Sequence, residues 1–479
     1  MQLDPDICWR AHRARDARFD GRFFTAVGST RIYCRPVCTA PLPKRENCRF
    51  YASAAAAEQA GYRPCLRCRP ELAPGLASVD ASARLARAAA SLIDDGALTD
   101  ANLASLAQRL GVTDRHLRRV FEAELGVTPI AYAQTARLLL AKRLLTDTAL
   151  PVTDVAMAAG FGSLRRLNTL FAQRYRMSPS ALRSERAPRR LDHHVFRLHT
   201  RQPFDFASLL RFHGDRAAGG VEAADAKGYR RTLALPSAEG RTAAGWVEIR
   251  RAARGTGIEV RVDARLATAI PRVLAACKRA FDLNCRPDEV RAVLGDLAQA
   301  HPGLRLPGAF DAFELGVRAI LGQQVSVQAA RTLAHRLVQR FGAPIETPFP
   351  ELDRLFPDAA RLAAAKPAQI AELGIVAQRA RAVVAFAQAV ADGRVRLDPA
   401  ADVERTLAAL AALPGIGEWT AQVIAMRALH WPDAFPPGDV AVLKALGCSR
   451  AEALARAQRW RPWRAYAVIH LWKSLEKPR

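Results

Sequence analysis

The chain has 479 residues, half of them apolar, with 71 Lys and Arg against 46 Asp and Glu, which gives a formal net charge of +25. This length exceeds what one hydrophobic core usually organises, so several domains are expected. No run of about 18 apolar residues and no signal-peptide pattern occurs, which argues against a membrane protein and predicts a cytoplasmic one. A GC-rich coding sequence would enrich arginine, but codon bias alone does not produce an excess of positive over negative residues. The charge therefore indicates nucleic acid as the partner, with a nucleoid-associated location.

The first 73 residues hold six of the nine cysteines. Cys34 and Cys38 are four positions apart and Cys65 and Cys68 three apart, a spacing with which two tight turns hold one tetrahedral zinc ion. In a reducing compartment, paired cysteines favour metal binding or catalysis over disulfides. We expect one Zn²⁺ per chain. A purely structural zinc finger would show the same spacing.

The sequence around these cysteines is more specific than their spacing. "FFTAVGSTRIYCRPVC" and "RENCRFYASAAAAEQAGYRPCLRCRP" resemble the N-terminal domain of the Ada family of adaptive-response DNA repair proteins. The resemblance implies that Cys34 is both a zinc ligand and the irreversible acceptor of a methyl group from a methylphosphotriester in DNA, with Cys38, Cys65 and Cys68 as the other ligands. Methylation makes the site less negative, and in the family this switches on tight, sequence-specific DNA binding. The phosphate contacts expected here are Arg35, Arg45 and Arg67, with Arg31 and Arg63, although a solvated basic face would look the same.

Helical periodicity follows over 81–186, after a linker at 70–80. Two segments, 103–121 and 152–171, share a glycine (Gly111, Gly160) followed by a polar helix, as in a helix-turn-helix. The stretch "AAGFGSLRRLNTLFAQRYRMSPSALR" resembles the signature of AraC-type regulators, which implies two helices in successive major grooves of double-stranded DNA. The expected base-reading residues include Arg115, His116, Arg165, Arg166 and Asn168. A helical bundle without DNA contact is the alternative.

Strand patterns then appear between 192 and 268, and a helical pattern fills 269–479. "VFRLHTR", "YRRTLALP" and the hairpin "GWVEIRRAARGTGIEVRVD" read as strands of a small α/β domain. The fold class expected is multidomain α+β. Its four units are a zinc domain (1–76), a double helix-turn-helix (81–186), a small α/β domain (192–268) and an all-α domain (269–479).

The all-α domain carries "LPGIGEWTAQVIAMRAL" followed by "FPPGDVAVLKALG". The first resembles a helix-hairpin-helix, in which the backbone N–H groups of Gly415 and Gly417 approach a DNA phosphate. An aspartate 22 residues past the hairpin, with "FELGVRAILGQQVSVQAA" and "WRPWRAYAVIHLWKSL", narrows the resemblance to 3-methyladenine DNA glycosylase II of the AlkA type, over roughly 192–479. The P-C-H-R motif of O6-alkylguanine repair does not occur in the chain.

This resemblance assigns roles. Asp439 is the expected catalytic carboxylate, and Trp419 and Trp472 are expected to line the pocket for the damaged base. Related enzymes that also cleave the strand have a lysine where Trp419 stands, so hydrolysis without strand cleavage is predicted. Gln324 takes the place of an apolar wedge that fills the vacated stack, and Val423 replaces a pocket aromatic of some relatives. A monovalent cation at the hairpin is also expected. Read singly, an aspartate at a helix start is usually an N-cap and a tryptophan usually belongs to the core.

Together these features predict a bifunctional alkylation-damage protein. It would take a methyl group onto Cys34, activate repair genes with RNA polymerase as a further partner, and excise alkylated purines as an N-glycosyl hydrolase. One rival is a transcriptional regulator with structural zinc and a catalytically inactive, lesion-binding C-terminal half. Another is a plain nucleic-acid-binding zinc protein.

Overall fold

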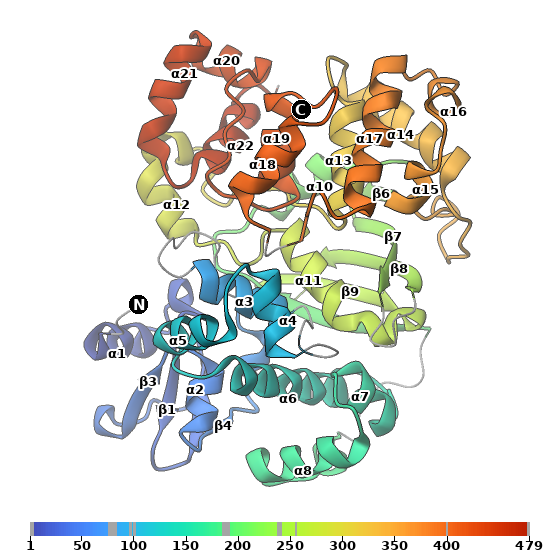
Figure 1. Cartoon of the computed structure of the whole chain (residues 1–479). Coiled ribbons are helices and arrows are strands. Elements are labelled where there is room, and N and C mark those ends of the chain that lie inside the picture. The colour runs from blue at the N-terminus through green and yellow to red at the C-terminus, as the bar shows by residue number, and fades with distance from the viewer. Residues whose placement is uncertain are drawn as a thin grey trace. The chain divides into compact units, whose positions relative to one another are not determined.

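The structure is a computed structural model that describes residues 4–74, 84–94, 98, 102–183, 192–236, 242–253, 256–398 and 401–476 (Figure 1). The predicted domain ends at 76, 81, 186 and 479 lie outside these residues. The chain divides into two compact units. The first comprises Met1–Gln202, Leu235–Ala243 and Ala252–Ala275, and the second Pro203–Ala234, Ala244–Arg251 and Ala276–Arg479.

The cysteine-rich segment folds around a four-stranded sheet of order β3-β1-β2-β4. β1 pairs antiparallel with both β2 and β3, whereas β2 and β4 are parallel, with Tyr33 opposite Pro64. Cys34 ends β2 and Cys65 directly follows β4, so the parallel pairing brings the two cysteine motifs together. The elements of this segment are α1 (Pro5–Arg13), β1 (Phe24–Val27), β2 (Ile32–Cys34), β3 (Cys48–Tyr51), α2 (Ala54–Gln59) and β4 (Arg63–Pro64).

The next segment is all helical and confirms the two predicted helix-turn-helix repeats. Gly111 and Gly160 adopt positive φ angles of 68° and 78° at the turns, a conformation that side chains with a Cβ disfavour. Thr113 and Ser163 then cap the second helix of each repeat by accepting a backbone N–H. The helices are α3 (Arg84–Asp94), α4 (Leu103–Arg109), α5 (Asp114–Leu125), α6 (Pro129–Asp147), α7 (Val152–Ala158), α8 (Leu164–Tyr175) and α9 (Pro179–Leu182).

A five-stranded sheet of order β5-β9-β8-β7-β6 follows, which confirms the predicted strands and adds the short β6. β5 and β9 pair antiparallel along their whole length, from His193 opposite Asp263 to His199 opposite Gly257. The elements are β5 (His193–His199), α10 (Phe206–Gly214), β6 (Glu222–Asp225), β7 (Gly228–Pro236), β8 (Thr242–Arg251) and β9 (Gly257–Asp263).

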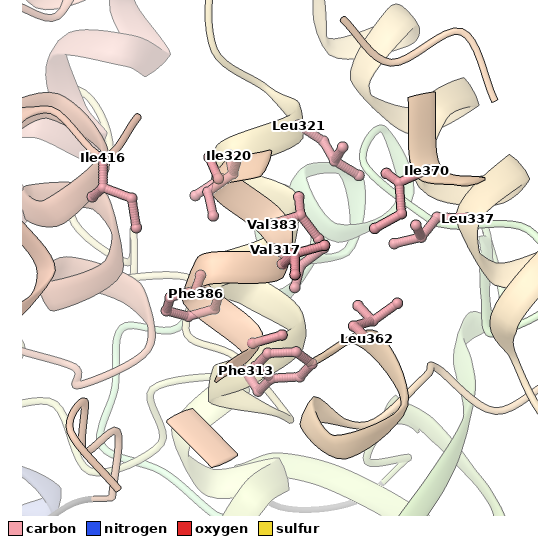
Figure 2. Packing of buried hydrophobic residues seen from close by; sticks show 14 of the residues in the cluster. Phe313, Val317, Ile320, Leu321, Leu337, Leu362, Ile370, Val383, Phe386 and Ile416 are labelled. Carbon is pink, nitrogen blue, oxygen red and sulfur yellow. The ribbon is translucent and has the colours of Figure 1, made fainter. Parts of the chain in front are cut away.

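The rest of the chain is helical, as predicted. A hydrophobic core lies around α13, α17 and α19, and the rings of Phe313 and Phe386 stack there at 5.5 Å (Figure 2). A Cβ at Gly316 would lie 2.2 Å from the Phe386 ring, so only glycine lets α13 and α17 approach this closely. The helices are α11 (Ile270–Ala280), α12 (Pro287–Leu294), α13 (Ala312–Leu321), α14 (Val327–Phe341), α15 (Ala359–Ala363), α16 (Pro367–Ala371), α17 (Ala377–Ala391), α18 (Val403–Ala411), α19 (Glu418–Arg427), α20 (Val440–Leu446), α21 (Arg450–Ala457) and α22 (Arg464–Ser474). Within the described residues, no helix combines the length and apolarity needed to cross a membrane.

Candidate functional sites: a four-cysteine centre and a carboxylate pocket

The structure brings Cys34, Cys38, Cys65 and Cys68 together, with their sulfur atoms all within 4.8 Å of one another. Four sulfurs around one zinc ion at 2.3 Å would lie about 3.8 Å apart, so the donor set and its spacing fit tetrahedral zinc. Three of the cysteines are buried and Cys68 is partly exposed. The backbone N–H of Arg35 lies 3.4 Å from the Cys68 sulfur, where it can stabilise negative charge on that sulfur.

Arg35 itself departs from the expectation of a phosphate contact, because its side chain is only 4% exposed. Its guanidinium forms a buried, two-armed ion pair with Asp20, in which the Nε–Oδ1 distance is 2.8 Å. It also donates to the carbonyl oxygen of Cys68 at 3.1 Å. The side chain therefore holds the ligand loops in place, and it does not face solvent in this structure. Sequence spacing gave no sign of this, because Asp20 lies far from both cysteine motifs.

The other predicted DNA contacts lie at or near the surface. Arg67 is exposed, and Arg45 stacks over Phe50 at 5.2 Å while its guanidinium lies 3.4 Å from Asp6. The predicted reading residues are all exposed and lie in the N-terminal halves of two helices, α5 and α8, called the reading helices below. They are Arg115 and His116 on α5, and Arg165, Arg166 and Asn168 on α8.

In the second unit, Asp439 lies directly before α20 and is 7% exposed. Its Oδ1 accepts the N–H of Val442 at 2.9 Å, so the residue is an N-cap. The same carboxylate also accepts a hydrogen bond from each predicted indole. Trp419 Nε1 donates to Oδ2 at 2.7 Å, and Trp472 Nε1 donates to Oδ1 at 3.0 Å. An ionised carboxylate offers about four acceptor directions, so among the described residues one direction on Oδ2 is left open. Asp439 is therefore an N-cap whose carboxylate is also hydrogen-bonded to both predicted pocket indoles.

The three residues line a cavity of about 550 Å³. Phe212 of α10 also lines it, stacked parallel to Trp472 with ring centroids 6.3 Å apart. The guanidinium groups of Arg216 and Arg427 lie over the Phe212 ring at 3.7 and 4.9 Å, and burial together with Arg216 lowers the pKa of Arg427 to about 9. Phe212 was missed by sequence reasoning because it lies more than 200 residues before Asp439 in a strand-and-helix region without a motif.

The hairpin between α18 and α19 has the geometry that its glycines predict. Gly415 has φ +82°, and a Cβ there would lie 2.8 Å from that of Ala382. Gly417 is the N-cap of α19 and provides no side chain to satisfy the first-turn N–H groups, which leaves them available to an anion.

Gln324 lies in the loop between α13 and α14, exposed and at φ +51°, an uncommon angle for a residue with a Cβ. Its neighbour Gln323 ties this loop to the hairpin. The Gln323 Nε2 donates to the Gly415 carbonyl at 2.8 Å and to Thr420 Oγ1 at 2.9 Å. The loop that carries Gln324 and the hairpin are therefore held at a fixed separation.

Comparison with known protein families matches four stretches of the chain. Residues 7–71 match the metal binding domain of Ada, 106–185 a helix-turn-helix domain, 195–311 the AlkA N-terminal domain, and 317–457 the HhH-GPD superfamily of base excision DNA repair proteins.

Among curated proteins, the chain is 38% identical to the "Probable bifunctional transcriptional activator/DNA repair enzyme AlkA" of Mycobacterium tuberculosis, with 100% of this chain and 98% of the relative covered. It is 39% identical to the DNA-3-methyladenine glycosylase 2 of Escherichia coli over 58% of this chain and 96% of that protein. It is also 39% identical to the E. coli bifunctional transcriptional activator/DNA repair enzyme Ada, over 33% of this chain and 43% of that protein. The chain therefore belongs to the family of bifunctional proteins that join an Ada-type zinc-binding and helix-turn-helix regulator to an AlkA-type DNA glycosylase.

Proposed function

We propose that the second unit is a monofunctional glycosylase that hydrolyses the N-glycosidic bond of alkylated purines of the 3-methyladenine type. The observation that carries this proposal is the Asp439 carboxylate, held by both pocket indoles at the edge of the cavity. Trp419 and Trp472 offer electron-rich faces to a base that alkylation has made cationic. The base must leave the DNA stack to enter such a cavity.

The chemistry follows from the charges. When the C1′–N bond breaks, its electron pair goes to the base, which leaves neutral, and the sugar becomes an oxocarbenium ion. The ionised Asp439 stabilises this cation, and its open Oδ2 direction can accept a proton from the water that adds to C1′. The position of Trp419 offers no amine for a Schiff base, so the product is an abasic site in an intact strand.

An Asp439→Asn variant tests this assignment, because asparagine keeps the cap of α20 and removes the charge. Loss of one preorganised electrostatic group predicts a fall in base release of roughly 100-fold or more, with lesion-DNA binding retained. Free methylpurines released from alkylated DNA are quantified, with the exposed Asp392→Asn as control. Release by Asp439→Asn at the wild-type rate would refute the assignment and favour a lesion-binding role for this half.

For the first unit, the cluster of four sulfurs favours a second activity, transfer of a methyl group from a DNA methylphosphotriester to Cys34. Zinc, when bound by these four residues, keeps the sulfurs deprotonated at neutral pH. The Cys34 sulfur attacks the methyl carbon, the carbon–oxygen bond breaks, and its electron pair stays on the phosphate oxygen. The products are a thioether at Cys34 and an ordinary phosphodiester.

Peptide mass after exposure of the zinc-loaded chain to methylphosphotriester DNA tests this step. One added methyl on the peptide that holds Cys34 is expected. A methyl found on the Cys65–Cys68 peptide, or none at all with zinc retained, would reduce Cys34 to a structural ligand.

In the proposed reaction, methylation removes one negative charge, and a less negative protein is repelled less by DNA phosphates. We therefore further propose that the methylated chain binds promoter DNA through α5 and α8 and recruits RNA polymerase. Run-off transcription with and without prior methylation checks promoter binding and polymerase recruitment together.

A monovalent cation at the hairpin remains part of the proposal. Replacement of K⁺ by tetramethylammonium at equal ionic strength should weaken lesion-DNA binding if that cation is present.

A further inference from the structure

Helix α2 of the cysteine-rich segment reaches the C-terminal ends of both reading helices. At its start, Ser53 caps α2 by accepting the N–H of Ala56 and donates its hydroxyl to the carbonyl oxygen of Leu125 at 2.9 Å. Leu125 is the last residue of α5. The start of α2 is thus tied to the end of the first reading helix that lies away from the predicted reading residues.

Near the other end of α2, Glu58 is 1% exposed and makes the second tie. Its Oε1 accepts the hydroxyl of Tyr175, the last residue of α8, at 3.3 Å. Its Oε2 accepts Thr135 Oγ1 of α6 at 3.1 Å, and its backbone carbonyl accepts Arg174 Nη1 of α8 at 3.0 Å. Tyr33, next to Cys34, donates to Oε1 at 2.9 Å from within the cysteine-rich segment.

A carboxyl group in this position is costly unless it is hydrogen-bonded, and an apolar side chain would fill the space without that cost. What the carboxyl adds is direction, because its two oxygens accept hydroxyl groups from three different elements, β2, α6 and α8. α6 connects the two repeats, and Figure 1 shows α2 lying against it. One short helix thereby contacts the connecting helix and the ends of both reading helices.

We propose that Glu58 is a positioning residue through which α2 fixes the separation and relative direction of α5 and α8, and so sets the base-pair spacing between the two stretches of DNA that the chain reads. The proposal rests on the proposed DNA reading by α5 and α8. It adds that the methyl-acceptor domain is part of the device that measures spacing. A change of one base pair displaces one stretch by about 3.4 Å and rotates it by roughly 35°, so a rigid pair of helices cannot follow it.

The test uses the zinc-loaded full chain, before and after exposure to methylphosphotriester DNA. Duplexes are selected from a random-sequence library with the wild-type chain, and the selected duplex is then remade with one base pair inserted between its two protected stretches. Because the insertion removes the base contacts of one reading helix, wild type should lose roughly tenfold or more in affinity on insertion. Tyr175→Phe and Glu58→Ala should bind the selected duplex several-fold more weakly and lose no more than about threefold on insertion.

Tyr33→Phe is the matched control, because it removes a hydroxyl from the same Glu58 oxygen but the lost hydrogen bond lies within the cysteine-rich segment. It should keep the wild-type response to insertion. A merely structural role would lower thermal stability in all three variants and leave the response to spacing unchanged, which would overturn the proposal. If Glu58→Ala fails to fold, Tyr175→Phe, which keeps the ring packed on Phe171, decides alone. If wild type selects no sequence at all, the proposed DNA-reading function fails and this inference fails with it. If wild type selects a sequence but Tyr175→Phe loses as much affinity on insertion as wild type does, only this inference is refuted.

Discussion

In the proposed chemistry, the four-cysteine centre and the carboxylate pocket each use a negatively charged side chain on an alkyl lesion, but the two side chains have different surroundings. Cys34 lies among three further sulfurs on short loops and strands, and its proposed reaction forms a permanent bond. Asp439 is fixed by two indoles and a helix N-terminus beside a cavity, and its proposed role leaves it unchanged. A side chain that reacts only once, such as Cys34, can depend on a bound ion to keep it charged. A side chain that acts in repeated cycles, such as Asp439, needs fixed hydrogen-bond donors and a cavity for the leaving base.

Removal of zinc is expected to produce the largest difference between the two sites. Apparent binding free energies of structural zinc sites are about 10–16 kcal/mol, so chelation should unfold the cysteine-rich segment and abolish methyl uptake. Base excision should continue at the wild-type rate, because Asp439 and its partners contain no metal ligand in the proposed chemistry. Zinc release, circular dichroism and methylpurine release are measured on one sample. Loss of excision on chelation would show that the two sites are not independent.

A smaller effect concerns pH and only the first unit. Burial raises the pKa of Glu58 to about 7, against the opposing hydrogen bonds from Tyr33, Thr135 and Tyr175 and the charge of Arg174. The folded protein therefore binds a proton that the unfolded chain releases near pH 4.5, so this group's contribution to stability is lost as pH rises from about 4.5 to 7. The ceiling is about 3 kcal/mol for this shift.

Urea unfolding from pH 5.5 to 8 measures this effect as the difference between wild type and Glu58→Gln, which cancels the pH dependence of zinc binding common to both. The difference should change with pH in favour of the variant as pH rises. A difference that is flat with pH would show that Glu58 does not titrate in this range.

Next in size is the loss of one indole donor at the pocket. Trp472→Phe keeps a ring against Phe212 and removes the hydrogen bond to Oδ1 of Asp439. A hydrogen bond to a charged group contributes about 1.5–3 kcal/mol, so single-turnover excision should slow by roughly 10- to 100-fold. Trp463→Phe, buried elsewhere in the same unit, is the control and should be near wild type in rate. Equal effects of the two variants would mean that packing, and not donation to Asp439, explains the loss.

The smallest effect expected is at the tie between the Gln324 loop and the hairpin. Gln323→Met keeps the length of the side chain and loses two neutral hydrogen bonds, about 1–2 kcal/mol in total, which predicts a roughly 5- to 30-fold slower excision from fully paired DNA. The rate should recover on a lesion placed in a bulge, where the base is already unstacked. Gln328→Met on the exposed side of α14 serves as control. An equal loss on paired and bulged DNA would place Gln323 in the chemical step instead of the flipping step.

The sequence allowed the residues grouped at the two candidate sites to be predicted better than the residues that support them. The cysteine spacing and the hairpin followed by Asp439 are local patterns, and each one constrains the backbone within a few residues. The Asp20 partner of Arg35, the Phe212 ring on Trp472 and the contacts of Glu58 join residues that are distant in the chain. Such pairings depend on tertiary packing, which leaves no periodicity or spacing to read, and Arg35 was therefore assigned to DNA when it is paired with Asp20.

The most direct test of two separate chemistries in one chain is product analysis on a single duplex that carries both a methylphosphotriester and 7-methylguanine. The zinc-loaded wild-type chain, Cys34→Ala and Asp439→Asn are compared for methyl on protein peptides and for free methylpurine. The assignment of methyl transfer to Cys34 and of base excision to Asp439 predicts that wild type gives both products, that Cys34→Ala gives only the free base, and that Asp439→Asn gives only the methylated Cys34 peptide. Free base released by Asp439→Asn at the wild-type rate, or methyl found on the Cys34→Ala protein, would contradict it.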